Sequence, residues 1–137
     1  MAFLSEAELR KIFKEELASS KELGKLTKLE EQNAATWIEP GTSEENADVT
    51  VTRDAESGKR HYIVGVIATY GGEEAAGVLD VSEGETVKIS GYATDRTPLV
   101  ILLSKPYKAG NNTAVSARLG AGGEGAIGKV NLIGFTI

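Results

Sequence analysis

The sequence predicts a mainly β protein: an antiparallel β-sandwich of jelly-roll type with an N-terminal α-helical arm. Of the 16 glycines, only Gly24 and Gly41 precede Ala47. Behind Ala47 the chain is a series of short apolar or alternating segments separated by turn sequences, with no spacer long enough for a helix. We therefore divide the chain into an arm with its linker, residues 1–46, and a β-sandwich domain, residues 47–137.

The arm opens with a predicted amphipathic helix. Ser5 is a suitable N-cap, and Glu8, three residues later, completes a capping box. A helix of this length is marginal in water by itself, so its apolar stripe needs a partner surface. That surface is either the β-domain of the same chain or another subunit or protein. The stripe consists of Leu9, Ile12, Phe13 and Leu17.

The segment 33–46, "NAATWIEPGTSEEN", is predicted to be an irregular linker, because Pro40 and Gly41 interrupt regular structure. Trp37 lies in this segment. We expect it to anchor the linker on a hydrophobic surface; the alternative is a platform on which a sugar stacks.

The β-domain should contain seven or eight short strands. Two segments, 49–53 and 86–92, alternate apolar and polar residues, as half-buried strands do. Three others are apolar on both faces: 61–70, 98–104 and 129–137. The turns between strands are rich in Gly, Asn, Asp or Pro, as in "ESGK", "YGGEE", "SEGE", "ATDRTP", "KAGNN" and "LGAGGEGA".

The doubly apolar strands predict a covered outer surface, because the outer face of an antiparallel sandwich is usually polar. In the segment 61–70, Tyr62, Val64, Val66 and Tyr70 are expected to share one face, and Ile63 and Ile67 the other. We expect symmetry-related copies, in a homotrimer, to cover this surface. The predicted interface residues of the β-domain are Ile63, Ile67, Ile133, Phe135 and Ile137, and those of the arm are the apolar stripe and Trp37.

Charge and composition exclude several classes of function. The net charge is -5 and the chain has no cysteine, which disfavours general binding to nucleic acid or anionic membranes and rules out disulfides and thiolate metal sites. The start of the chain lacks the pattern of a signal peptide, and no segment approaches the length of a membrane span.

No catalytic or cofactor site is predicted. The single histidine, His61, has no second histidine or cysteine with which to bind a metal, and is expected to be structural or on the surface. Gly120, Gly122 and Gly125 match the spacing of a dinucleotide fingerprint, but the residues that follow predict a strand where that motif needs a helix. We therefore expect a non-enzymatic protein without cofactor or metal.

Residues 60–137 resemble the small β-domain of tailed-bacteriophage capsid decoration proteins. The resemblance rests on the stretches "RHYIVGVIATYGGEEAAGVLDV", "VKISGYA" and "GAIGKVNLIGFTI". It implies a jelly-roll-like trimer on a capsid surface, made in the host cytoplasm. The arm would hold the shell, built of the major capsid protein, or a neighbouring subunit. No catalytic residue is implied.

The alternative is a module of a phage fibre, tail or adhesin that binds a carbohydrate or receptor. Its site would be formed by the loops "YGGEE", "ATDRTP" and "KAGNN", with Tyr70, Tyr92 or Tyr107 stacking on a sugar ring.

Overall fold

The computed structural model describes residues 35–137, together with Ala7, and residues 35–137 form one compact β unit. The predicted apolar stripe of the arm, Leu9, Ile12, Phe13 and Leu17, lies outside the described residues.

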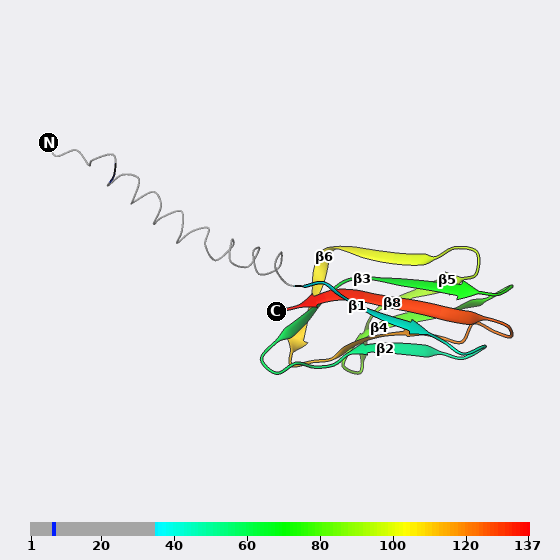
Figure 1. Cartoon of the computed structure of the whole chain (residues 1–137), viewed down its shortest axis with the longest axis horizontal. Coiled ribbons are helices and arrows are strands. Elements are labelled where there is room, and N and C mark those ends of the chain that lie inside the picture. Colours follow the sequence, from blue (N-terminus) through cyan, green and yellow to red (C-terminus); the bar gives the residue numbers. More distant parts are fainter. Residues whose placement is uncertain (1–6, 8–34) are drawn as a thin grey trace. The chain divides into compact units, whose positions relative to one another are not determined.

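The described unit contains eight strands in two four-stranded antiparallel sheets (Figure 1). The first sheet has the order β1-β8-β3-β6 and the second the order β2-β7-β4-β5. Successive strands cross from one sheet to the other except at β4–β5, which is the connectivity of a jelly roll. The strands are β1 (Trp37–Thr42), β2 (Val49–Arg53), β3 (Arg60–Gly71), β4 (Ala76–Glu83), β5 (Thr86–Thr94), β6 (Leu99–Asn111), β7 (Val115–Leu119) and β8 (Ile127–Thr136).

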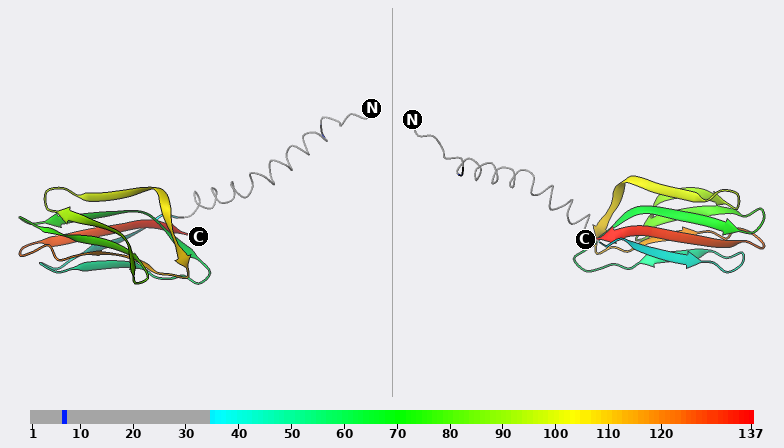
Figure 2. Two further views of the ribbon diagram at one scale, coloured as in Figure 1. Left: turned by 180° about the vertical axis from the view of Figure 1, so that it is seen from behind. Right: turned by 45° about the horizontal axis from the view of Figure 1, so that its top comes forward.

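The core lies between the two layers of strands, which the views in Figure 2 show from two further directions. Its largest fully buried apolar side chains come from both sheets: Ile63, Val66, Val130 and Leu132 from the first, and Leu79, Val81, Val115 and Leu119 from the second. The predicted mainly β sandwich is therefore confirmed for the described residues.

The prediction of an irregular linker is wrong for residues 37–42. They form β1, which pairs in register with β8 from Trp37 opposite Gly134 to Thr42 opposite Lys129. Pro40 is tolerated because β1 is an edge strand with only one hydrogen-bonded neighbour, so a missing N–H costs little there.

The alternation predicted for β3 is also wrong, because the strand contains a bulge. In the pairing with β8, Ile63 lies opposite Gly134 and Gly65 opposite Ile133, so Val64 is an extra residue. The bulge shifts the alternation by one position. Ile63 and Val66 are therefore both in the core, while Ile67 is only half-buried.

The last strand, β8, is central: it pairs with β1 on one side and β3 on the other. Its end is fixed by two backbone hydrogen bonds, from Arg60 N–H to Ile137 O (2.8 Å) and from Ile137 N–H to Arg60 O (3.0 Å). A central strand needs an apolar inner face, which accounts for Val130 and Leu132 in β8.

Candidate binding surfaces

Apolar side chains from all four strands lie together on the outer side of the first sheet. We call this surface the apolar face. Three of its members are well exposed: Leu102 at 70%, Ile38 at 58% and Val100 at 52%. The apolar face is formed by Ile38, Tyr62, Val64, Ile67, Val100, Leu102 and Ile133, together with Phe135, which is only 6% exposed and stacks on Tyr62.

Local packing fixes the side chains at the centre of the apolar face. Tyr62 and Phe135 are direct cross-strand partners, and their rings stack with centroids 4.8 Å apart and planes 7° apart. Leu102 lies over Gly65, where a Cβ would come within 2.9 Å of its Cδ2. The bulge in β3 thus does two things: it returns Val66 to the core and leaves a bare backbone for Leu102 to cover.

The outer side of the second sheet is mostly polar. Ser90 donates a hydrogen bond to Asp80 (2.6 Å), and Arg118 forms an exposed ion pair with Asp48 (3.0 Å). Tyr92 is the large exception, with 82% of its surface exposed, and it pairs across the strands with Val78. The two faces of the sandwich therefore differ in kind.

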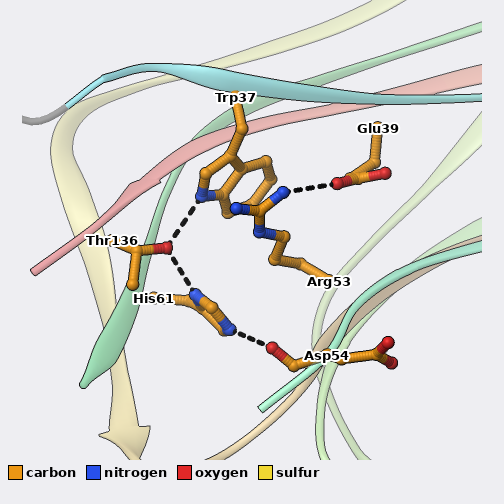
Figure 3. Close-up of polar contacts among 6 residues, drawn as sticks. All are labelled: Trp37, Glu39, Arg53, Asp54, His61 and Thr136. Carbon is orange, nitrogen blue, oxygen red and sulfur yellow. Dashed lines mark hydrogen bonds and ion pairs between the residues drawn. The ribbon is translucent and has the colours of Figure 1, made fainter. Parts of the chain in front are cut away.

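The lone histidine lies in a buried hydrogen-bonded cluster (Figure 3). His61 is 1% exposed; its Nε2 lies 2.6 Å from the carbonyl oxygen of Asp54 and its Nδ1 lies 2.7 Å from Thr136 Oγ1. Since a carbonyl can only accept, Nε2 donates, and Nδ1 accepts from the Thr136 hydroxyl. Trp37 Nε1 donates to the same hydroxyl oxygen at 2.9 Å.

This cluster is structural. It joins β1, β3, β8 and the segment after β2, and its groups satisfy one another. Within residues 35–137, no buried side-chain nitrogen or oxygen lacks a hydrogen-bond partner. His61 therefore has no free nitrogen with which to act on a substrate, and Trp37, 9% exposed, is not available as a sugar platform.

Next to this cluster, Arg53 lies over the Trp37 ring, 5.2 Å from its centroid, and pairs with Glu39 (2.9 Å). An open polar hollow of about 350 Å³ adjoins the pair, lined by Glu39, Thr52, Arg53, Asp54 and Glu56. The described residues contain no group of three or more side chains suited to holding a metal ion.

A second polar link joins β4 to β6. Tyr107 donates from its hydroxyl to one carboxylate oxygen of Glu83, and the Gly110 N–H donates to the other. Both hydrogen bonds lower the pKa of Glu83, the one from Tyr107 more strongly. The same contact raises the pKa of Tyr107 to about 12.

The three loops predicted to bind a sugar do not converge. The first two lie together at one end of the sandwich, where Asp95 N–H donates to Ala75 O. The loop after β6 lies at the other end, where Asn112 N–H donates to Lys59 O. Tyr70 is buried and donates to Gly120 O. Tyr107 is bound to Glu83. Tyr92, with 82% of its surface exposed, is therefore the most accessible of the three tyrosines.

The glycine-rich loop before β8 binds its own chain. Asn46 and Glu45 accept hydrogen bonds from the backbone N–H groups of Gly123 and Gly125, each at 3.1 Å. Since this loop leads into a strand, the dinucleotide reading of its glycines has no structural basis.

The predicted interface residues are divided by the structure. Ile67, Ile133 and Phe135 are on the apolar face, and Ile137 is half-buried at the end of β8. Ile63 and Trp37 are buried in the core cluster. Ile38 is on the apolar face although the sequence predicts a linker at its position. Val100 and Leu102 also lie there, in the doubly apolar segment 98–104, outside the predicted interface set.

No helix among the described residues is long and apolar enough to cross a membrane.

No family model and no curated protein matches the chain. Among solved structures, the chain is similar to the CBM36-1 domain of a multidomain xylanase from the hindgut metagenome of Trinervitermes trinervoides, at 12% identity and a TM-score of 0.44, over 73% of this chain and 95% of that one. It is also similar to a carbohydrate-binding module CBM36 in complex with calcium and xylotriose, at 16% identity and a TM-score of 0.44, over 75% and 93%.

A third similar structure is the insecticidal delta-endotoxin Cry8Ea1 from Bacillus thuringiensis, at 7% identity and a TM-score of 0.38, over 76% of this chain and 19% of that one. Similarities this distant do not carry the function of these proteins over to this chain.

Proposed function

We propose that this protein is a non-enzymatic structural module that works by contact between protein surfaces. The observation that supports this is the apolar face, where Leu102, Ile38 and Val100 are each more than half exposed on one side of a sandwich whose other side is mostly polar. Contiguous exposed apolar surface is typical of sites that bind other proteins. The self-satisfied His61 cluster supports a role without catalysis.

The module has two parts with different tasks. The apolar face of the β-domain makes the contacts within an assembly. The predicted apolar stripe of the arm attaches that assembly to its support, which the sequence resemblance proposes to be the shell of a tailed-bacteriophage capsid. This capsid setting rests on the resemblance alone.

Co-sedimentation of the full chain with undecorated shells of tailed bacteriophages tests the attachment. The Phe13→Glu variant, which places a charge in the predicted stripe, should lose shell binding. The control variant Lys14→Glu, at the next position of the same predicted helix and outside its apolar stripe, should retain it. A full chain that stays in the supernatant, or equal binding by both variants, would contradict the proposed attachment.

A second candidate function is carbohydrate binding through the polar face. Tyr92 supports it, because its ring is 82% exposed beside Asp80, Ser90 and Val78, and an exposed ring flanked by hydrogen-bonding groups suits a sugar. Affinity electrophoresis in gels containing soluble polysaccharides would test this candidate. Retardation of the wild type that is lost in Tyr92→Ala would support it, and unretarded migration in every gel would reject it.

A further inference from the structure

We infer that the occupant of the apolar face is the same face of a second copy, so that two chains pair sheet to sheet about a two-fold axis. This inference rests on the proposed function and specifies its partner. It is drawn from the surface chemistry of the described residues, and it differs from the three-fold assembly that the sequence resemblance implies.

The surfaces of the domain differ in how well they complement the apolar face. In a head-to-tail contact, the apolar face would need a second, different apolar surface on the neighbouring copy. The remaining exposed large apolar residues of the described unit are Val78, Val87, Tyr92 and Ile127. Val78 and Tyr92 lie among the polar residues of the second sheet, and Val87 and Ile127 lie on different sheets. Among the surfaces of residues 35–137, the best complement to the apolar face is therefore the apolar face itself, since the stripe of the arm is assigned to the shell in the proposed function.

The extent of the face also suits a second sheet, because it spans four neighbouring strands and its side chains are held in place by packing such as the Tyr62–Phe135 stack. Sheets pack face to face at about 10 Å when their inner side chains are apolar and interdigitate. In an isologous pair, the protruding Leu102 and Ile38 of each copy would enter the spaces between the partner's side chains.

The distribution of charge is also compatible with pairing through the apolar face. Each chain carries a net charge of -5, so two copies repel at long range. None of the side chains that define the apolar face is charged, and the charged Lys129 lies toward the end at which the face becomes polar, opposite Thr69 and Thr42. Face-to-face pairing therefore keeps like charges away from the centre of the contact.

The size of the face predicts that the pair is weak. Four strands about 4.8 Å apart and the rise along β3 from Tyr62 to Ile67 give a footprint of roughly 15 Å by 17 Å. This is small compared with the ~800 Å² per partner of a standard stable interface. We therefore expect weak association that depends on protein concentration, with a dissociation constant in the micromolar range or above.

Sedimentation equilibrium of the full chain over a range of concentrations tests the pairing. The chain offers a matched pair of variants: Val100, 52% exposed on the apolar face, and Val87, 50% exposed on β5 in the other sheet. Val100→Glu would place like charges in the contact and should weaken association at least about tenfold. Val87→Glu adds the same charge elsewhere and should associate like the wild type.

Each other result contradicts the pairing. A wild type that is monomeric at all concentrations would overturn it, as would a limiting mass of three chains or equal association of both variants. Circular dichroism of Val100→Glu checks that the variant is folded. Attachment to the shell is measured in the separate co-sedimentation experiment. If Phe13→Glu loses shell binding while the wild type is monomeric, the structural role stands and only the two-fold pairing is rejected.

Discussion

At the scale of single residues, every buried side-chain nitrogen and oxygen in residues 35–137 has a hydrogen-bond partner, and this gives the cluster around His61 its importance. The Thr136 hydroxyl accepts from Trp37 and donates to His61, so one small side chain satisfies two larger buried ones. Leaving a buried polar group without its partner costs more free energy than an average hydrogen bond contributes to stability, because the buried group cannot bond to water instead.

Replacing Thr136 by valine tests this dependence. Valine keeps the shape of threonine but leaves Trp37 Nε1–H and His61 Nδ1 without partners, so the free energy of unfolding should fall by about 1–3 kcal/mol. The control is Thr50→Val, on the exposed side of β2, which should change stability by less than about 0.5 kcal/mol. Urea unfolding at neutral pH measures both. Equal stability of the two variants would mean that the cluster is not needed to hold the four segments together.

Gly134 shows why a central strand contains a glycine at this position. A Cβ on Gly134 would lie 2.6 Å from two atoms of the Trp37 ring and would collide with the Tyr62 carbonyl oxygen. We expect Gly134→Ala to destabilise the domain by about 1–3 kcal/mol, as overpacked cores do. Gly71→Ala, where the nearest heavy atom to a new Cβ is 3.9 Å away, is the matched control and should be near neutral. Thermal unfolding that is the same for both variants would contradict this account.

At the scale of strands and loops, the Glu83–Tyr107 contact fixes β4 to β6 and makes stability depend on pH at both extremes. The pKa of Glu83 is lowered in the folded state, so its stabilising effect is present above the ordinary glutamate pKa of 4.5 and is lost as pH falls through the lowered pKa of the folded state. The pKa of Tyr107 is raised from 10.0 to about 12, so its effect is present below pH 10 and is lost as pH rises toward about 12.

Replacing Tyr107 by phenylalanine should reduce this pH dependence. The variant removes the largest cause of the lowered Glu83 pKa, so the wild type should lose more stability than the variant between neutral pH and pH values below 4.5. Tyr92→Phe, at a position that is 82% exposed and pairs with Val78 rather than with Glu83, should follow the wild type. Urea midpoints across the pH series give the comparison, and parallel curves for all three proteins would mean that the contact does not form in solution.

Most of the fold could be predicted from local patterns, because strands and turns follow from alternation and from Gly, Asn and Pro. Register could not be predicted in the same way. The extra residue Val64 shifts the faces of β3, and only the pairing with β8 reveals it. Pro40 indicated a break, although an edge strand accepts proline.

The presence of an apolar outer surface could be predicted from the sequence, but not all of the residues that form it. The doubly apolar strands indicated an apolar outer surface, and Ile67, Ile133 and Phe135 are on that side of the first sheet. Ile63 and Ile67, which were expected on one face, lie on opposite sides because the bulge at Val64 lies between them. The partners of His61 come from segments up to 75 residues away in the chain, and no local pattern connects them.

At the scale of the whole domain, the two outer faces of the sandwich differ in polarity: one side suits an apolar partner and the other suits water. If two copies pair through the apolar face, the attraction is hydrophobic, and the opposing force is the repulsion between two chains of net charge -5. Added salt should therefore favour pairing, because the ions screen the repulsion and leave the burial of apolar surface intact.

Association should therefore strengthen as sodium chloride is raised from about 20 mM to about 500 mM, since the Debye length falls well below the size of the domain over that range. Sulfate at equal ionic strength should strengthen it further, because sulfate favours apolar burial. A contact made by ion pairs such as that between Asp48 and Arg118 would respond in the opposite sense and weaken with salt. Sedimentation equilibrium of the wild type in these buffers, with Val100→Glu as the non-pairing reference, separates the two, and a dissociation constant that rises with salt would place the contact on the polar face.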